Sequence, residues 1–304
     1  MSAPLKLVAF AATIAAVFAV SAVAGGAFDP DVSTTTPQAH EEEDAMSATH
    51  VESETDSGHA APEGAEGQSL PGVAVSAAGY RLELERTSFE SGADQTLTFR
   101  IADDSGETVR DFEIEHERPM HLIVVRSDFE AFQHLHPRRL PDGSWQVIAD
   151  LSRPGSYRVF ADFATAERSL TLGADASVAG RYDPVPLADP SSTAAAGDGY
   201  EVAISRSEVA GGELAPVAFT VSRNGEEVAD LDPYLGADGH LVTLREGDQA
   251  FLHTHPRGEP GGAGPIEFDV EYPSAGRYRL FLQFKHRGEV RTAEFTQEAT
   301  DAGH

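Results

Sequence analysis

Residues 154–163 read Pro-Gly-Ser-Tyr-Arg-Val-Phe-Ala-Asp-Phe, and residues 276–284 repeat this pattern as Gly-Arg-Tyr-Arg-Leu-Phe-Leu-Gln-Phe. Each run is short and rich in aromatic and branched apolar side chains, which is typical of a β-strand. Other matches between the two halves keep an offset of 119 to 121 residues. Two copies are too few for a solenoid, so the sequence predicts a tandem pair of similar domains.

Each copy is predicted to be all-β. Turn residues separate short apolar runs, and no segment after the N-terminus shows a helical period. About seven strands in roughly 100 residues are typical of an antiparallel β-sandwich. In the first copy the expected strands are residues 80–85, 96–101, 121–125, 132–136, 145–149, 157–163 and 169–172.

Residues 1–28 are predicted to be a membrane anchor or a signal peptide. Lys6 precedes a run of 22 residues without charge, close to the roughly 20 residues that span a bilayer. The small residues Ala22 and Ala24 also provide a cleavage site for signal peptidase. We expect an uncleaved N-terminal helix, with a cleaved signal as the alternative. Both place the rest of the chain outside the cytoplasm.

The remaining chain divides by composition. Residues 29–72 contain eleven acidic residues and no lysine or arginine, which predicts a disordered acidic linker. Residues 73–175 and 199–298 are the two expected β-sandwich domains. Residues 176–198, with prolines and an Ala/Gly/Ser-rich end, are expected to link them.

The overall charge and the absence of cysteine narrow the function. The formal net charge is −28, and Lys6 and Lys285 are the two lysines. No basic patch exists to neutralise phosphates, so nucleic acid is not an expected partner. Without cysteine, the chain has no disulfides, thiolate metal sites or cysteine nucleophiles.

Three histidines recur with the same spacing in both copies. Imidazole nitrogens are good ligands for zinc and copper. The repeated pattern therefore predicts a copper or zinc ion as cofactor, with one site in each copy. The predicted ligands are His121, His134 and His136 in the first copy and His240, His253 and His255 in the second.

A hairpin would bring the first set together. If Ile123 lies opposite His134, then His121 lies opposite His136, and the three imidazoles share one face at the open end of the hairpin. The expected register depends on strand pairing, because a shift of one residue would separate the histidines.

The same register in the second copy places His240 opposite His255. Polar replacements such as Thr243 fall on the other face of this hairpin. The histidine face is therefore expected to point into the sandwich, giving a site at one end of the fold beneath loops. Asp162 is a further carboxylate candidate, although a surface ion pair is the commoner role for such a residue.

Two alternatives to simple metal binding remain open. The histidines can be structural, in which case the chain is a tandem β-sandwich interaction module. A metal-dependent enzyme is also conceivable, because three histidines leave an open coordination position. No nucleophile or acid–base pair accompanies them, so the chain is not expected to be an enzyme.

The runs Gly155-Ser-Tyr157 and Gly276-Arg-Tyr278 resemble the tyrosine corner of immunoglobulin-like sandwiches and the strand entry of cupredoxins. In cupredoxins a cysteine ligand would follow near Ala161 and Leu282. Neither position is cysteine, so a blue-copper site is excluded and the resemblance implies only the scaffold.

Residues 80–297 resemble a group of bacterial exported two-repeat proteins that share the pattern His-Leu…Phe-x-His-x-His-Pro. The resemblance implies a loose association with heavy-metal handling and no particular reaction. Together with the histidines, it favours an extracytoplasmic metal-binding protein that buffers or delivers copper or zinc. The expected partners are the metal ion and, through the N-terminal segment, a membrane.

Overall fold

The computed structural model describes residues 70–205, 209–252, 254–258, 261 and 264–301. The predicted anchor or signal at residues 1–28 lies outside this range, as does the acidic segment up to residue 69. The described residues form strands and turns and contain no helix. No membrane-crossing helix is therefore found among them.

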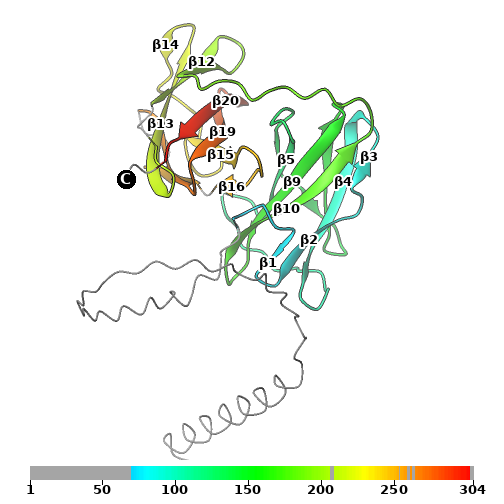
Figure 1. Cartoon of the computed structure of the whole chain (residues 1–304). Helices are drawn as coiled ribbons and strands as arrows, with labels where there is room; N and C mark the ends of the chain where they lie inside the picture. The colour runs from blue at the N-terminus through cyan, green and yellow to red at the C-terminus, as the bar shows by residue number, and fades with distance from the viewer. Residues whose placement is uncertain (1–69, 206–208, 253, 259–260, 262–263, 302–304) are drawn as a thin grey trace, which may run out of the picture. The chain divides into compact units, whose positions relative to one another are not determined.

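The first repeat consists of two sheets, coloured cyan to green in Figure 1. One sheet has the order β1 (Ser76–Ala77), β2 (Tyr80–Leu84), β4 (Gly92–Asp103), β8 (Trp145–Leu151) and β7 (Arg138–Arg139). The other has the order β3 (Ser88–Phe89), β10 (Ser169–Val178), β9 (Gly155–Ala164), β5 (His121–Arg126) and β6 (Gln133–Leu135). All the strands expected for this repeat are present, with boundaries that differ by a few residues.

The second repeat, yellow-green to red in Figure 1, also has two sheets. The larger has the order β11 (Thr193–Ala195), β12 (Tyr200–Ser205), β13 (Glu213–Arg223), β18 (Ile266–Tyr272) and β17 (Thr254–Arg257), with β14 (Glu226–Glu227) also paired to β13. The smaller has the order β16 (Phe251–Leu252), β15 (Gly239–Arg245), β19 (Gly276–His286) and β20 (Glu289–Ala299). For the described residues, the prediction of an all-β fold with an internal repeat is confirmed.

Each repeat packs its two sheets around its own apolar core. Phe99 and Trp145 of one sheet meet Val159 of the other in the first repeat. Phe219 and Phe295 occupy the corresponding core of the second. Strand β12 shows why the sequence forms such layers, because its buried and exposed residues alternate strictly, as expected for a strand with one solvated face.

A tyrosine corner begins the long strand β9 and its counterpart β19. The hydroxyl of Tyr157 donates to the carbonyl of Arg153 at 2.7 Å, and that of Tyr278 donates to the carbonyl of Ser274 at 2.7 Å. Gly155 precedes the first corner at a φ of 138°, where its lack of a Cβ is needed because a Cβ would lie 2.6 Å from the Tyr182 ring. The predicted resemblance to a tyrosine corner is confirmed.

The outer faces of two strands pack against each other across the repeats, which belong to one compact unit, Pro62–His304. In β5, Leu122 belongs to the core of the first repeat, whereas Ile123 and Val125 belong to a separate cluster. That cluster also contains Val242 and Leu244 of β15. Strand β5 is therefore buried on both faces.

Aromatic contacts across this seam are reciprocal. Phe132 of the first repeat stacks on Phe281 of the second, with ring centroids 3.9 Å apart, and Phe251 lies 5.7 Å from Phe160. Phe132 and Phe251 are equivalent in the repeat, as are Phe160 and Phe281. Reciprocal contacts between equivalent residues are the property of a two-fold interface, so the repeats pack like the subunits of a symmetric dimer.

This packing corrects the expectation that the histidine face points into the sandwich. His121 and His134 share the face of Ile123, which is turned away from the first core and toward the second repeat. The inference from polar replacements fails because Thr243 is fully buried despite its hydroxyl. Both faces of the strand are covered, so polarity does not identify the inner one.

The described chain begins with a short segment that contacts both repeats. The carbonyl of Pro71 accepts a hydrogen bond of 2.9 Å from the amide of Phe251, and the amide of Gly72 donates to Thr171 at 2.8 Å. Arg158 also donates to the carbonyl of Gly72 at 2.7 Å. Residues 71 and 72 therefore add backbone hydrogen bonds to the seam.

Tyr157→Phe is expected to lower the free energy of unfolding by about 1 kcal/mol, because it removes one hydrogen bond and leaves the carbonyl of Arg153 without that partner. Urea unfolding followed by tryptophan fluorescence measures the change. Tyr80→Phe is the control, since the Tyr80 hydroxyl makes no hydrogen bond within the described residues. Equal stability of both variants would contradict a stabilising corner.

Phe281→Ala is expected to lower the free energy of unfolding by about 3–5 kcal/mol, because it leaves a cavity beside Phe132. Scanning calorimetry should resolve two transitions where the native chain gives one. Phe295→Ala removes an equally buried ring from the second core alone and serves as the control. A single transition at native stability for Phe281→Ala would show that the seam contributes little.

Candidate metal centre

Three histidines meet where β5 begins and β6 ends. Ile123 pairs with His134 as the sequence predicted, which brings His121 close to His134 and to His136 just beyond the strand. One ligand atom from each imidazole lies within 4.8 Å of the others. The ring centroids are 4.9 to 5.2 Å apart. These three side chains are spaced so that they could hold one metal ion.

Hydrogen bonds place the ring proton of His121 and, when Gln283 turns its amide oxygen to the ring, that of His134. His121 Nε2 lies 3.1 Å from the backbone carbonyl of Glu115, which can only accept, so this nitrogen carries the hydrogen. His134 Nδ1 lies 2.7 Å from Oε1 of Gln283 and donates to it. Metal-bound histidines commonly donate their second N–H to such oxygens, which orients the ring.

The two remaining nitrogens then face each other as lone pairs. His121 Nδ1 and His134 Nε2 are 3.0 Å apart. In neutral rings with these tautomers, neither atom has a hydrogen to donate to the other. Two nitrogens of a tetrahedral zinc site, with Zn–N distances of about 2.0–2.1 Å, are roughly 3.3 Å apart. A small displacement would therefore accommodate a cation between them.

His136 supplies a third nitrogen without a partner. Its Nε2 is buried and makes no hydrogen bond with any described residue. Burial of such an atom without a partner is unfavourable, by about 1–3 kcal/mol. A metal ion bound between the three rings would remove this penalty.

Burial keeps the three imidazoles in the neutral form that binds metals. Burial, followed by the neighbouring charge of a protonated His121, lowers the pKa of His134 to about 3 and that of His136 to about 4. The pKa of His121 is also lowered by burial, although its hydrogen bond to Glu115 opposes this. Protons therefore compete weakly with a metal at neutral pH.

The second copy contributes one histidine to this cluster. The His240 ring stacks on that of His134 with centroids 4.7 Å apart, and lies parallel to that of His121 at 5.9 Å. Burial lowers the pKa of His240 well below its usual value of 6.5. His240 therefore packs against the first-copy set, across the seam between repeats.

The expected pairing of His240 with His255 is wrong. The chain leaves β15 after β16, and His255 pairs instead with Asp269 in the other sheet, where it is exposed. Beyond β16, the hydroxyl of Thr254 donates to the carbonyl of Leu241 at 2.7 Å, where a longer β15–β16 pairing would have had a backbone hydrogen bond. His253 lies outside the described residues. The described histidines of the second set, His240 and His255, therefore do not form one site.

Two residues of the cluster were missed at the sequence level. The His116 ring lies 5.9 Å from that of His121 and 5.6 Å from that of His240. Its repeat equivalent is Leu235, so a search for repeated histidines passes over it, although it stands five residues before His121. Gln283, the repeat equivalent of Asp162, was not predicted to contact the first-copy histidines.

Asp162 and Gln283 occupy equivalent positions with different roles. Asp162 lies opposite His121 in the β5–β9 ladder, and Gln283 lies opposite His240 in the β15–β19 ladder. Asp162 accepts a hydrogen bond of 2.7 Å from the hydroxyl of Thr171. Its charge raises the pKa of His121, so it acts on the cluster electrostatically.

A pocket of about 540 Å³ gives access to the cluster from solvent. His134 and His136 lie in its wall, and the turns that carry Arg118 and Tyr234 form its rim. Lys285, one of the two lysines, lines the same pocket. The site therefore has an entrance, as metal loading requires.

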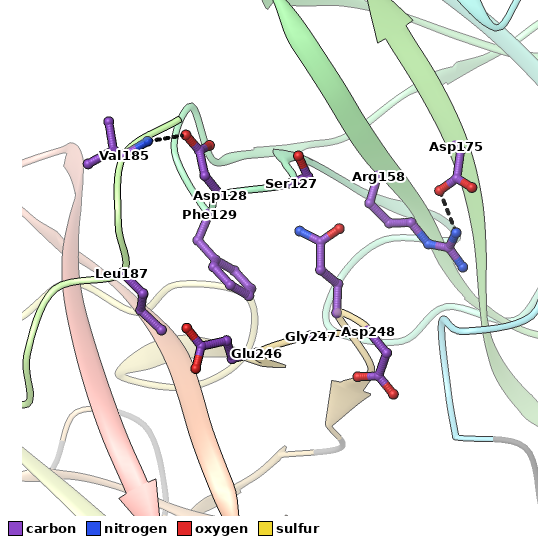
Figure 2. Close-up of a pocket in the computed structure, with 11 residues that line it drawn as sticks. Ser127, Asp128, Phe129, Arg158, Asp175, Val185, Leu187, Glu246, Gly247 and Asp248 are labelled. Atoms are coloured by element: carbon purple, nitrogen blue, oxygen red, sulfur yellow. Dashed lines mark hydrogen bonds and ion pairs between the residues drawn. The ribbon is translucent and has the colours of Figure 1, made fainter. Parts of the chain in front are cut away.

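Another pocket, of about 410 Å³, is lined by four carboxylates (Figure 2). Its carboxylates look suited to a cation, but each forms an ion pair with an arginine. The pairs are Asp128 with Arg126, Asp175 with Arg158, Asp248 with Arg245 and Glu246 with Arg277. The histidine cluster is therefore the stronger candidate.

Residues 74–180 and 193–301 each match the family model described as a domain of unknown function, DUF8832. The chain belongs to this family. The two matches make it a two-repeat member, and each DUF8832 repeat contains the two sheets of one sandwich. A comparison with curated proteins gives no match.

Solved structures resemble the DUF8832 tandem only distantly. The alpha-2-macroglobulin of Salmonella reacted with methylamine is 12% identical with a TM-score of 0.27, and the alignment covers 77% of this chain and 15% of that one. A chimeric titin Z1Z2-Z1Z2 tandem is 13% identical with a TM-score of 0.20, covering 73% and 97% of the two chains. These similarities identify no function.

The low pKa of His134 predicts how the metal-free protein loses stability in acid. The unfolded chain takes up a proton at this histidine below about pH 6.5, whereas the folded chain does so only near its pKa of about 3. The contribution of neutral His134 to the free energy of unfolding is therefore complete above about pH 6.5 and is lost as the pH falls below that value. The expected loss is about 2 kcal/mol between pH 7 and pH 5 for a histidine that stays neutral.

Urea unfolding at several pH values tests this. His134→Gln should reduce the dependence of stability on pH, because Gln does not titrate. His255→Gln replaces an exposed histidine and should leave the dependence unchanged. The same pH dependence in the native chain and in His134→Gln would mean that His134 is not held neutral by burial.

Proposed function

We propose that this protein binds a copper or zinc ion outside the cytoplasm and buffers or delivers it, through His121, His134 and His136. The main support is that the lone pairs of His121 Nδ1 and His134 Nε2 face each other, with the two nitrogens 3.0 Å apart. Their proton positions follow from bonds to the carbonyl of Glu115 and to Gln283. The unpartnered nitrogen of His136 completes the ligand set.

All-nitrogen coordination suits Cu(II) and Zn(II), and the natural order of affinities favours Cu(II). The resemblance to exported proteins with this histidine pattern supports a role in heavy-metal handling. The predicted anchor or signal supports a location outside the cytoplasm. We propose no enzymatic reaction, because no nucleophile paired with a general base lies beside these histidines among the described residues.

The sequence predicted a second site at His240, His253 and His255, one for each repeat. We place the ion at the first set, since His255 is exposed on a different sheet. His240 then acts as a packing partner of the ligands. The expected metal content is one ion per chain.

A structural role for the histidines is the second candidate, and Gln283 is the residue that separates the two. If its amide is turned around, it donates to His134 Nδ1, and His134 Nε2 then carries the hydrogen and donates to His121. The three groups would satisfy one another without a metal. The chain would then be a tandem β-sandwich interaction module.

Elemental analysis of purified protein tests the metal proposal. His134→Ala should remove essentially all bound metal, whereas His255→Ala should retain it. Added Cu(II) or Zn(II) should raise the melting temperature of the native chain near neutral pH, because the ion binds the folded state. Retention of half the metal in His134→Ala would indicate a working second site.

Gln283→Glu distinguishes the tautomers, because an ionised carboxylate only accepts hydrogen bonds. It should keep His134 in the metal-binding form and preserve metal binding. Gln283→Leu, which cannot accept, should weaken binding by about 10–100-fold, as expected for loss of an orienting partner. If the native protein contains no metal and Gln283→Glu is less stable than the native protein, the histidines are structural.

A further inference from the structure

The pocket in front of the histidines contains two cations without ion-pair partners. Arg118 and Lys285 both line it, and neither forms an ion pair with any described residue. Among the described residues of its wall, Glu117 alone carries a carboxylate. In a chain with a net charge of −28, a pocket with more positive than negative groups is unusual. Such a pocket suits an anion.

The cations come from opposite repeats. Arg118 ends a two-residue turn closed by backbone hydrogen bonds of 3.0 Å with Glu115, which also fixes His121. Its side chain lines the same pocket as His134 and His136. Lys285 follows Gln283, the partner of His134, by two residues on β19. Arg118 therefore belongs to the turn that contacts His121, and Lys285 belongs to the strand that carries Gln283.

Three histidine ligands leave one coordination position open, which a small donor can fill. Positive charges beside that position oppose a bare divalent cation and attract a negatively charged ligand. An anion bound to the metal would relieve this repulsion and provide a partner for both cations. The metal and the anion would then strengthen each other's binding.

We infer that the pocket binds a small carboxylate together with the metal, with one carboxylate oxygen at the open coordination position and Arg118 and Lys285 as its ionic partners. The inference rests on the proposed metal site. The delivered species would accordingly be a metal–carboxylate pair, and not the bare ion. Tyr234 and Val290 in the same wall would contact the carbon end of the ligand.

Cu(II)-loaded protein titrated with azide tests the inference. Azide bound to Cu(II) gives a charge-transfer absorption band, so saturation of the band measures anion affinity at the open position. Arg118→Gln and Lys285→Gln should each weaken azide binding by up to about fivefold, as expected for a partly exposed ion pair. Arg118→Lys should keep most of the affinity. Arg139→Gln, an exposed position on β7, is the control.

Competition then identifies the class of anion. Acetate should displace azide from the native protein at lower concentration than sulfate does, and Arg118→Gln should reduce that advantage. Unchanged azide affinity in both charge variants, or displacement by sulfate in preference to acetate, would overturn the inference while leaving the metal site intact. Failure of Cu(II) to bind at all, seen before any azide is added, would instead refute the proposed function.

Discussion

The packing of one repeat against the other is the constraint on which the rest of the structure depends. Phe132 on Phe281 and Phe251 beside Phe160 join the outer faces of two sheets that would otherwise be exposed to water. Because apolar area is removed from water there, strands β5 and β15 are apolar on both faces. The seam also determines which side chains surround the histidines.

The histidine cluster is the polar end of this seam. Burial between the repeats keeps the rings of His134 and His240 neutral, and Gln283 reaches across to orient His134. The first repeat supplies the other fixed point through the carbonyl of Glu115. A single sandwich would present the three histidines on an open surface, where their nitrogens would hydrogen-bond to water. The protonation state of the histidines thus depends on both repeats.

Much of this arrangement follows from local rules that a sequence contains. Alternation with period two predicted the strands, and the spacing of Ile123 and His134 predicted the register of the hairpin. The inner face was predicted wrongly, since apolarity indicates burial without saying which partner covers the residue. The position of His255 was predicted wrongly because its strand could pair with either sheet, and it pairs with the strand that carries Asp269. Gln283 acts over 149 residues of sequence, a distance at which spacing gives no information.

The two-fold seam has a consequence for how the protein can diverge. In a dimer of identical chains, every substitution near the axis occurs twice, so each position must serve both halves. Here both halves belong to one chain, and each position changes alone. His116 faces the cluster where its equivalent is Leu235, and Asp162 stands opposite His121 where its equivalent is Gln283. Equivalent positions of the two halves can therefore carry different side chains beside the same seam.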